Sequence, residues 1–170
     1  MTPLVSIIMG SMSDYKIVEA AAKLLDEMQI PFELNALSAH RTPQEVEKYA
    51  QQASSRGVKV IIAAAGLAAH LPGVVAANTT LPVIGIPIKA DASPSGLDAV
   101  FSILQMPQGI PVATVGINAS QNAAILAVQI ISLIDIQVAQ NFAKFKSNLA
   151  QKVQKANEEL QLIKFKYKTN

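Results

Sequence analysis

Residues 57–66 read Gly-Val-Lys-Val-Ile-Ile-Ala-Ala-Ala-Gly, and this stretch decides the fold class. Val58 to Ala65 starts with β-branched residues and lies between two glycines, which predicts a central buried strand. Strands that are apolar on both faces are typical of a parallel sheet covered by helices on each side. We therefore expect a layered α/β fold built around residues 58–65.

Strand and helix patterns alternate along the neighbouring sequence. Further strands are predicted at residues 4–9, 31–37, 82–86 and 112–116, each as an apolar run. Helices are predicted at residues 14–28, 42–56, 72–77, 95–104 and 119–136. The second helix opens with Thr42-Pro43-Gln44-Glu45, which has the form of a capping box with proline at the first helical position. This order predicts a three-layer α/β sandwich with a central parallel sheet, flavodoxin-like or Rossmann-like.

The C-terminal segment has a different pattern. Apolar residues recur there at three- and four-residue steps, which predicts an amphipathic helix over residues 139–165: Phe142, Phe145, Leu149, Val153, Ala156, Leu160 and Ile163. We expect this helix to pack on the body of the protein or on a neighbouring subunit. Residues 1–170 are interpreted as a single domain. The lysines among residues 141–170 are interpreted as a solvated face rather than as a nucleic-acid site.

Composition limits the classes of protein to which the chain can belong. Charged residues make up 15% of the sequence, against about 25% in typical globular domains. Mean hydropathy is +0.32, so we expect burial of surface in a homo-oligomer. The absence of cysteine excludes disulfides, thiolate chemistry and cysteine-ligated zinc. Residues 60–69 form the longest charge-free apolar run of the first half, well short of the ~18 residues of a membrane span, and no signal-peptide pattern is present. We expect a cytoplasmic protein without membrane or nucleic-acid partners.

The chain contains two histidines, and each follows a predicted strand. Imidazole exchanges protons near neutral pH, and ligands of open α/β sheets bind at the carboxyl ends of the strands. His40 is therefore a candidate acid or base, with Arg41 beside it as a planar donor for phosphate. His70 is an equally good candidate for a ligand contact and for a local hydrogen bond. Two histidines without cysteine make a poor zinc site.

The loop after the first strand is a second candidate region. Ser11, Ser13 and Asp14 precede a predicted helix, whose free N–H groups favour an anion. The alternative is that Ser13 or Asp14 only caps that helix. The dinucleotide glycine fingerprint and the Walker A sequence are both missing, so neither NAD nor ATP is expected as a cofactor.

Four motifs, in the same order and spacing, resemble the N5-carboxyaminoimidazole ribonucleotide mutase family of purine biosynthesis. They are Gly10-Ser11-x-Ser13-Asp14, Ser38-Ala39-His40-Arg41-Thr42-Pro43, Ala69-His70-Leu71-Pro72-Gly73 and Gln105-Met106-Pro107-x-Gly109-Ile110-Pro111-Val112. The resemblance runs from the first strand to about Gln129. It implies a homo-octamer that moves a carboxylate from the exocyclic nitrogen of the aminoimidazole to ring carbon 4, without metal or cofactor.

The resemblance also implies a role for each matching residue. His40 becomes the general acid and base, and Ser11, Asp14 and Arg41 become substrate ligands. Ser13 and Ser38 lie near the phosphate, while Gly66, Ala69, His70 and Leu71 line the pocket for the ring and carboxylate. The chain departs from the usual family pattern at Tyr15, Leu67 and Gln108.

Protonation of a carbamate nitrogen promotes loss of CO2, so His40 can trigger release and later remove the proton from carbon 4. An apolar, alanine-lined cavity under residues 66–71 is expected to retain the CO2. Two alternatives remain open. One is direct carboxylation by CO2, whose animal-type enzymes usually carry lysine at the position of Arg41. The other is a non-catalytic phosphate-binding module of flavodoxin-like fold, in which His40 has no task.

Overall fold

A computed structural model describes all 170 residues and contains one five-stranded sheet. The strands are β1 (Val5–Met9), β2 (Phe32–Ala36), β3 (Val60–Gly66), β4 (Val83–Ile88) and β5 (Ala113–Thr114). Every pair is parallel and the order is β2-β1-β3-β4-β5, with β3 in the centre. The predicted parallel sheet and its central strand are confirmed.

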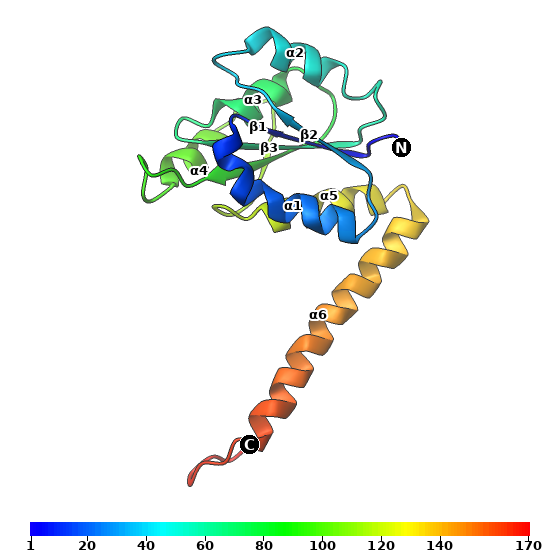
Figure 1. Cartoon of the computed structure of the whole chain (residues 1–170), viewed down its shortest axis with the longest axis vertical. Coiled ribbons are helices and arrows are strands. Elements are labelled where there is room, and N and C mark those ends of the chain that lie inside the picture. The colour runs from blue at the N-terminus through cyan, green and yellow to red at the C-terminus, as the bar shows by residue number, and fades with distance from the viewer.

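Helices cover both faces of the sheet (Figure 1). A short 3-10 turn, η1 (Met12–Asp14), precedes α1 (Tyr15–Glu27), which packs with α5 (Ser120–Ser132) on one face. The other face carries α2 (Pro43–Gln51), α3 (His70–Ala77) and α4 (Leu97–Leu104). The three-layer α/β sandwich is confirmed.

The central strand explains why the core is divided in two. Ile62 and Ala64 belong to the cluster under α1 and α5, whereas Ile61 and Ala63 belong to the cluster under α2, α3 and α4. Side chains of a strand alternate between the two faces of the sheet. Six of the seven residues of β3 are buried, and Gly66 is the exception. Each face of this strand therefore contributes side chains to a different one of the two clusters.

Several predicted boundaries differ from the structure. The second helix ends at Gln51 rather than Arg56, and residues 52–57 form turns. Thr42 makes no capping bond with its side chain; its hydroxyl instead accepts from the Ser38 N–H at 3.0 Å and donates to the Ser38 carbonyl at 3.2 Å. Thr42 therefore closes the preceding loop, while proline does begin the helix as predicted.

The junction before the last helix also differs. The helix predicted to reach residue 136 ends at Ser132, and α6 (Ile136–Leu162) begins three residues before its predicted start. Asp135 causes this division, because its carboxylate accepts from the N–H groups of Gln137 at 2.9 Å and Val138 at 3.1 Å. Such a side chain satisfies the free donors of a new helix.

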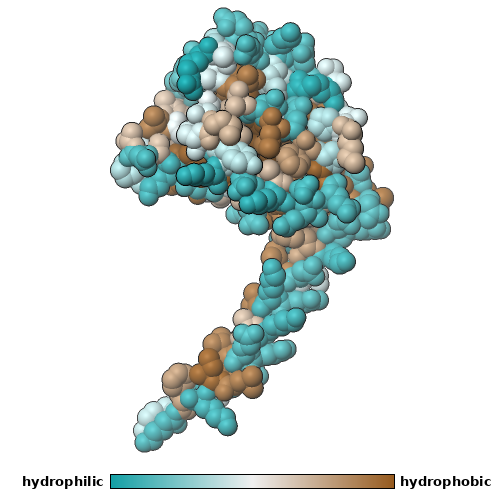
Figure 2. Space-filling model, in the orientation of Figure 1, coloured by the Kyte–Doolittle hydropathy of each residue, from teal (hydrophilic) through white to brown (hydrophobic).

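Only the first turns of α6 pack on the body. Val138 is buried, and Phe142 and Phe145 lie against the core cluster of α1 and α5. From Leu149 onward every residue of the helix is exposed, and the helix projects away from the sandwich (Figure 1). Apolar side chains gather near its far end (Figure 2). No helix of the protein combines the length and the apolar character that a membrane span requires.

Candidate functional site

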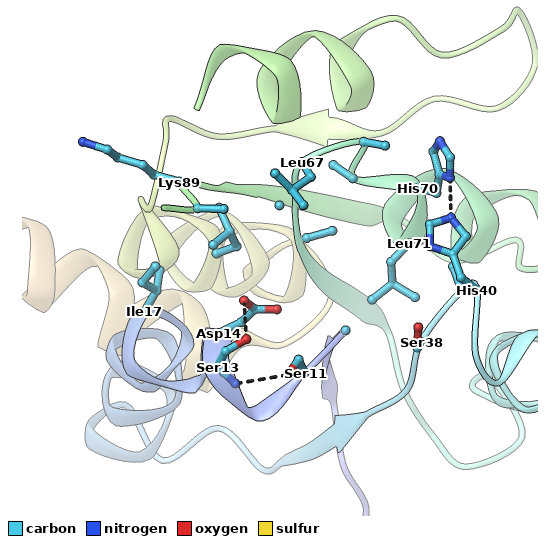
Figure 3. Close-up of a pocket in the computed structure, with 18 of the residues that line it drawn as sticks. Ser11, Ser13, Asp14, Ile17, Ser38, His40, Leu67, His70, Leu71 and Lys89 are labelled. Carbon is cyan, nitrogen blue, oxygen red and sulfur yellow. Dashed lines mark hydrogen bonds between the residues drawn. The ribbon is translucent and has the colours of Figure 1, made fainter. Parts of the chain in front are cut away.

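The polar loops follow β1, β2 and β3, which are neighbours in the sheet. Together with the loop after β4, they surround a cavity of about 620 Å³ (Figure 3). All ten residues that the sequence predicted for the site line this cavity: Ser11, Ser13, Asp14, Ser38, His40, Arg41, Gly66, Ala69, His70 and Leu71. Residues up to 60 positions apart thus meet at one edge of the sheet, as the carboxyl ends of parallel strands require.

The first loop presents hydroxyls and a carboxylate to the cavity. The Ser11 hydroxyl accepts from the Ser13 N–H at 3.3 Å and so caps η1. The Ser13 hydroxyl donates to the Asp14 carboxylate at 3.4 Å. Asp14 makes no capping bond to α1, so neither Ser13 nor Asp14 is occupied as a helix cap. Burial raises the pKa of Asp14, while its hydrogen bonds with the Ser13 side chain and the Ser11 backbone lower it.

Arg41 connects the second loop to the first. Its Nε donates to the Ser38 hydroxyl at 3.4 Å, and its Nη2 donates to the Gly10 carbonyl at 3.2 Å. The two salt bridges of the chain lie elsewhere, so Arg41 has no carboxylate partner. Because the guanidinium is bonded only to neutral acceptors, no carboxylate compensates its positive charge, which is available to an anionic ligand.

The third loop combines close packing with unusual backbone angles. A Cβ atom on Gly66 would lie 3.0 Å from the Ile88 carbonyl oxygen, which explains the glycine there. Leu67 and Ala69 adopt left-handed conformations with φ of +55° and +42°. Ala69 precedes α3 without a side-chain cap, so the first N–H groups of that helix remain available to a carboxylate.

The two histidines contact each other. His40 Nε2 lies 2.6 Å from His70 Nδ1 (Figure 3). Their ring centroids are 4.8 Å apart, and the ring planes meet at 81°. Two roles were predicted for His70, a ligand contact and a local hydrogen bond. Its position is compatible with both, because its hydrogen-bond partner, His40, is itself a site residue.

The loop after β4 also contributes to the site, although no sequence motif points to it. Lys89, Ala90 and Asp91 line the same cavity. The Lys89 N–H donates to the side-chain oxygen of Asn118 at 2.9 Å, which fixes the start of this loop. The signal that could have found it is topological, because β4 is a parallel neighbour of β3 and must end at the same edge of the sheet.

The cavity is open within a single chain. Alanines do line it, as expected: Ala39, Ala65, Ala68, Ala69 and Ala90. However, His40, Arg41, Leu67 and His70 are exposed, so the enclosed chamber expected for CO2 is not complete in one copy. No cluster of three or more His, Cys, Asp and Glu side chains has the arrangement of a metal site.

Residues 4–152 match the family model described as AIR carboxylase. The N5-carboxyaminoimidazole ribonucleotide mutase of Bacillus subtilis is 48% identical over 162 residues, which cover 94% of this chain and 99% of that protein. The phosphoribosylaminoimidazole carboxylase of Candida glabrata is 48% identical over 161 residues, which cover 95% of this chain but 28% of that protein. The solved structure of PurE from Treponema denticola has a TM-score of 0.83 at 31% identity, covering 93% of this chain and 98% of that one.

Proposed function

The chain belongs to the AIR carboxylase family, and we propose that it is a mutase, an isomerase of purine biosynthesis. It converts N5-carboxyaminoimidazole ribonucleotide to 4-carboxy-5-aminoimidazole ribonucleotide. The observation that carries this proposal is the convergence of all ten predicted residues on one cavity. The full-length mutase relative supports it, because the match extends over nearly the whole of both chains.

The polar groups suggest how the ribonucleotide binds. The phosphate lies against Arg41 and the hydroxyls of Ser11, Ser13 and Ser38, because these groups supply one permanent cation and three donors. Asp14 accepts from a ribose hydroxyl. The aminoimidazole and its carboxylate lie against Gly66, Ala69, His70 and Leu71, where the N-terminus of α3 favours negative charge.

His40 supplies the proton transfers. Its imidazolium protonates the exocyclic nitrogen, the nitrogen–carbon bond breaks with its electron pair staying on nitrogen, and CO2 is released. Ring carbon 4 then attacks the CO2, and His40 takes the proton that carbon 4 loses, so the proton balance closes. Acid–base help of this kind contributes about 10²–10⁴-fold, and retention of CO2 beside carbon 4 adds a proximity term.

A homo-oligomer, with eight subunits as the resemblance implies, belongs to the same proposal. Its support is the open cavity and the exposed apolar face of α6, both of which a second copy can cover. The cytoplasm is the proposed compartment, because the substrate is a phosphorylated intermediate of biosynthesis.

The test is a spectroscopic assay of interconversion with the wild type and His40→Asn side by side. We expect the variant to lose at least about 10²-fold in kcat while its affinity for the ribonucleotide changes little. Equal activity of the two proteins would remove His40 from the mechanism. Ribonucleotide binding by a wild type that shows no turnover would favour the non-catalytic phosphate-binding module.

Direct carboxylation is the second candidate, because the Candida glabrata relative carries that name. Labelled bicarbonate separates the two reactions. A mutase keeps the carboxylate of its own substrate, so the product stays unlabelled. Product that acquires the label at the rate of turnover identifies a carboxylase instead.

A further inference from the structure

We infer that His70 is a positioning residue for His40: it accepts a hydrogen bond from His40 Nε2–H and thereby fixes the tautomer in which His40 Nδ1 exchanges protons with the substrate. This inference rests on the proposed function and assigns His70 a task beyond lining the pocket. It starts from the 2.6 Å separation of His40 Nε2 and His70 Nδ1.

A nitrogen–nitrogen contact of this length contains one proton between its two atoms. Two N–H groups facing each other would repel, and two lone pairs would leave both nitrogens without a donor. Only one of the two facing nitrogens therefore carries a proton. The hydrogen bond at one nitrogen of a histidine decides what its other nitrogen can do.

The chemistry selects between the two possible directions of this bond. If His40 Nε2–H donates to His70 Nδ1, the neutral His40 has a lone pair at Nδ1 and can take the proton of carbon 4. If His70 Nδ1–H donates instead, the neutral His40 already carries its proton at Nδ1 and cannot act as a base there. Only the first direction serves both proton transfers without breaking the contact.

The acid form benefits in the same arrangement. When His40 is an imidazolium, its Nε2–H donates a charge-assisted bond to the neutral His70 ring, and such bonds are stronger than those between neutral groups. The other charged groups that line the cavity are Arg41, Lys89, Asp14 and Asp91, and none of them is bonded to either ring. His70 is therefore the one side chain in hydrogen-bond contact with the His40 ring.

Two substitutions of His70 separate positioning from shape. In His70→Asn the side-chain oxygen takes the approximate place of Nδ1 and can still accept, whereas His70→Phe keeps a planar ring without an acceptor. We expect His70→Phe to lower kcat by about 10–100-fold, which is within the usual range for an acid–base contribution. Both variants remove the contact of the imidazole with the substrate, so any change in KM should be similar in the two. His70→Asn recovers most of that loss. Equal losses in the two variants, no loss in His70→Phe, or an effect on KM alone would each overturn the inference.

A spectroscopic measurement on the wild type keeps the inference testable if a variant does not fold. Because the chain has two histidines, the imidazole ¹⁵N spectrum of the full-length labelled protein contains two ring systems. One direction of the bond places the proton at Nε2 of both neutral rings and the other places it at Nδ1 of both, so the spectrum needs no assignment by a variant. At a pH where both rings are neutral, we expect both to carry their proton at Nε2, with the His40 proton shifted furthest downfield. A proton on His70 Nδ1 would overturn the inference. A wild type without interconversion activity but with the expected spectrum would contradict the proposed function and not the hydrogen bond.

Discussion

Leu67 shows how a single residue carries strain at the site. Its backbone has a φ of +55°, although it is not glycine. The left-handed region costs L-residues roughly 1 kcal/mol or more. Such strain is tolerated where the surroundings hold the backbone in place, and it gathers at ligand-binding loops. Here the buried Leu71 and Val75 of α3 anchor the loop on one side, and β3 anchors it on the other.

We predict that Leu67→Gly is more stable than Leu67→Ala. Both variants remove the same exposed side chain, but only glycine relieves the left-handed strain. The free energy of unfolding should favour Leu67→Gly by roughly 0.5–1 kcal/mol, the reverse of the order at ordinary positions. Urea unfolding of the two variants measures this difference. An alanine variant as stable as the glycine variant would show that the backbone at residue 67 is not strained.

Asp14 gives a prediction in which stability and binding change differently. Burial raises its pKa, so the ionised form is disfavoured in the folded state, and stability falls as pH rises through the titration of this carboxyl. Asp14→Asn lacks that fall and should lose no stability at pH 7. Its KM should rise about ten-fold, because a charged acceptor for the ribose is lost. Urea unfolding at pH 4 and pH 7 and steady-state kinetics test both parts. A variant that is less stable at pH 7 with an unchanged KM would assign Asp14 a structural role.

At the residue scale the sequence predicted which side chains share the cavity, but not how they meet. His40 and His70 could each be placed after the carboxyl end of a strand, β2 and β3, which lie on either side of β1. Their direct bond depends on the rotamers of two loops. Lys89 was missed because it carries no motif. Its place in the cavity depends on β4 and on the bond from its N–H to Asn118, which is 29 residues away.

At the scale of elements, the order of strands and helices could be predicted from apolar periodicity. The residues at which the elements end could not, because they depend on contacts between residues distant in the sequence. The second helix is shorter than predicted, and residues 52–57 form turns. Arg56 there donates to the Glu33 carboxylate at 2.8 Å and to the Tyr49 carbonyl at 3.1 Å. Local sequence carries no signal for such long-range pairing. β5 is also shorter than the predicted strand, since residues 113 and 114 alone pair with β4.

Tyr49, on α2, predicts how the protein responds to alkaline pH. Burial is the main cause that raises its pKa to about 12; the Ser6 hydrogen bond and Arg56 act in the opposite direction, and Glu33 adds to the rise. The unfolded state releases this proton near pH 10 and the folded state near pH 12. Between these values ionisation stabilises the unfolded state relative to the folded state, so the free energy of unfolding falls by up to roughly 2–3 kcal/mol as pH rises.

Tyr49→Phe should lose this component of the pH dependence. At pH 8 we expect the variant to be less stable by about 1 kcal/mol, because a buried hydrogen bond to Ser6 is lost. The difference should shrink or reverse by pH 12. Denaturant unfolding of both proteins at several pH values measures it. Two parallel pH profiles would mean that Tyr49 titrates normally in the folded protein.

At the scale of the whole molecule, the part of α6 from Leu149 onward packs against nothing in one copy. Leu149 is 41% exposed and Val153 is 68% exposed, and both lie on the apolar stripe predicted from the sequence. A helix of this kind gains most of its stability by packing an apolar face. The sequence predicted the stripe, but periodicity cannot say whether the body or another subunit covers it. The structure answers this for Val138, Phe142 and Phe145, which pack on the body.

We predict that the exposed part of this stripe contacts another subunit. Leu149→Asp with Val153→Asp places two negative charges on the apolar stripe, whereas Gln151→Asp with Gln154→Asp places two negative charges on the polar side of the same turns. A buried, unpaired carboxylate is strongly unfavourable, so only the first variant should dissociate, with the smaller mass visible in sedimentation velocity. Because the cavity is open in one copy, dissociation should also lower kcat/KM. Helix content from circular dichroism controls for loss of α6 itself. If both variants kept the mass of the wild type, the stripe would not be a subunit contact, and closure of the cavity would have to come from another surface.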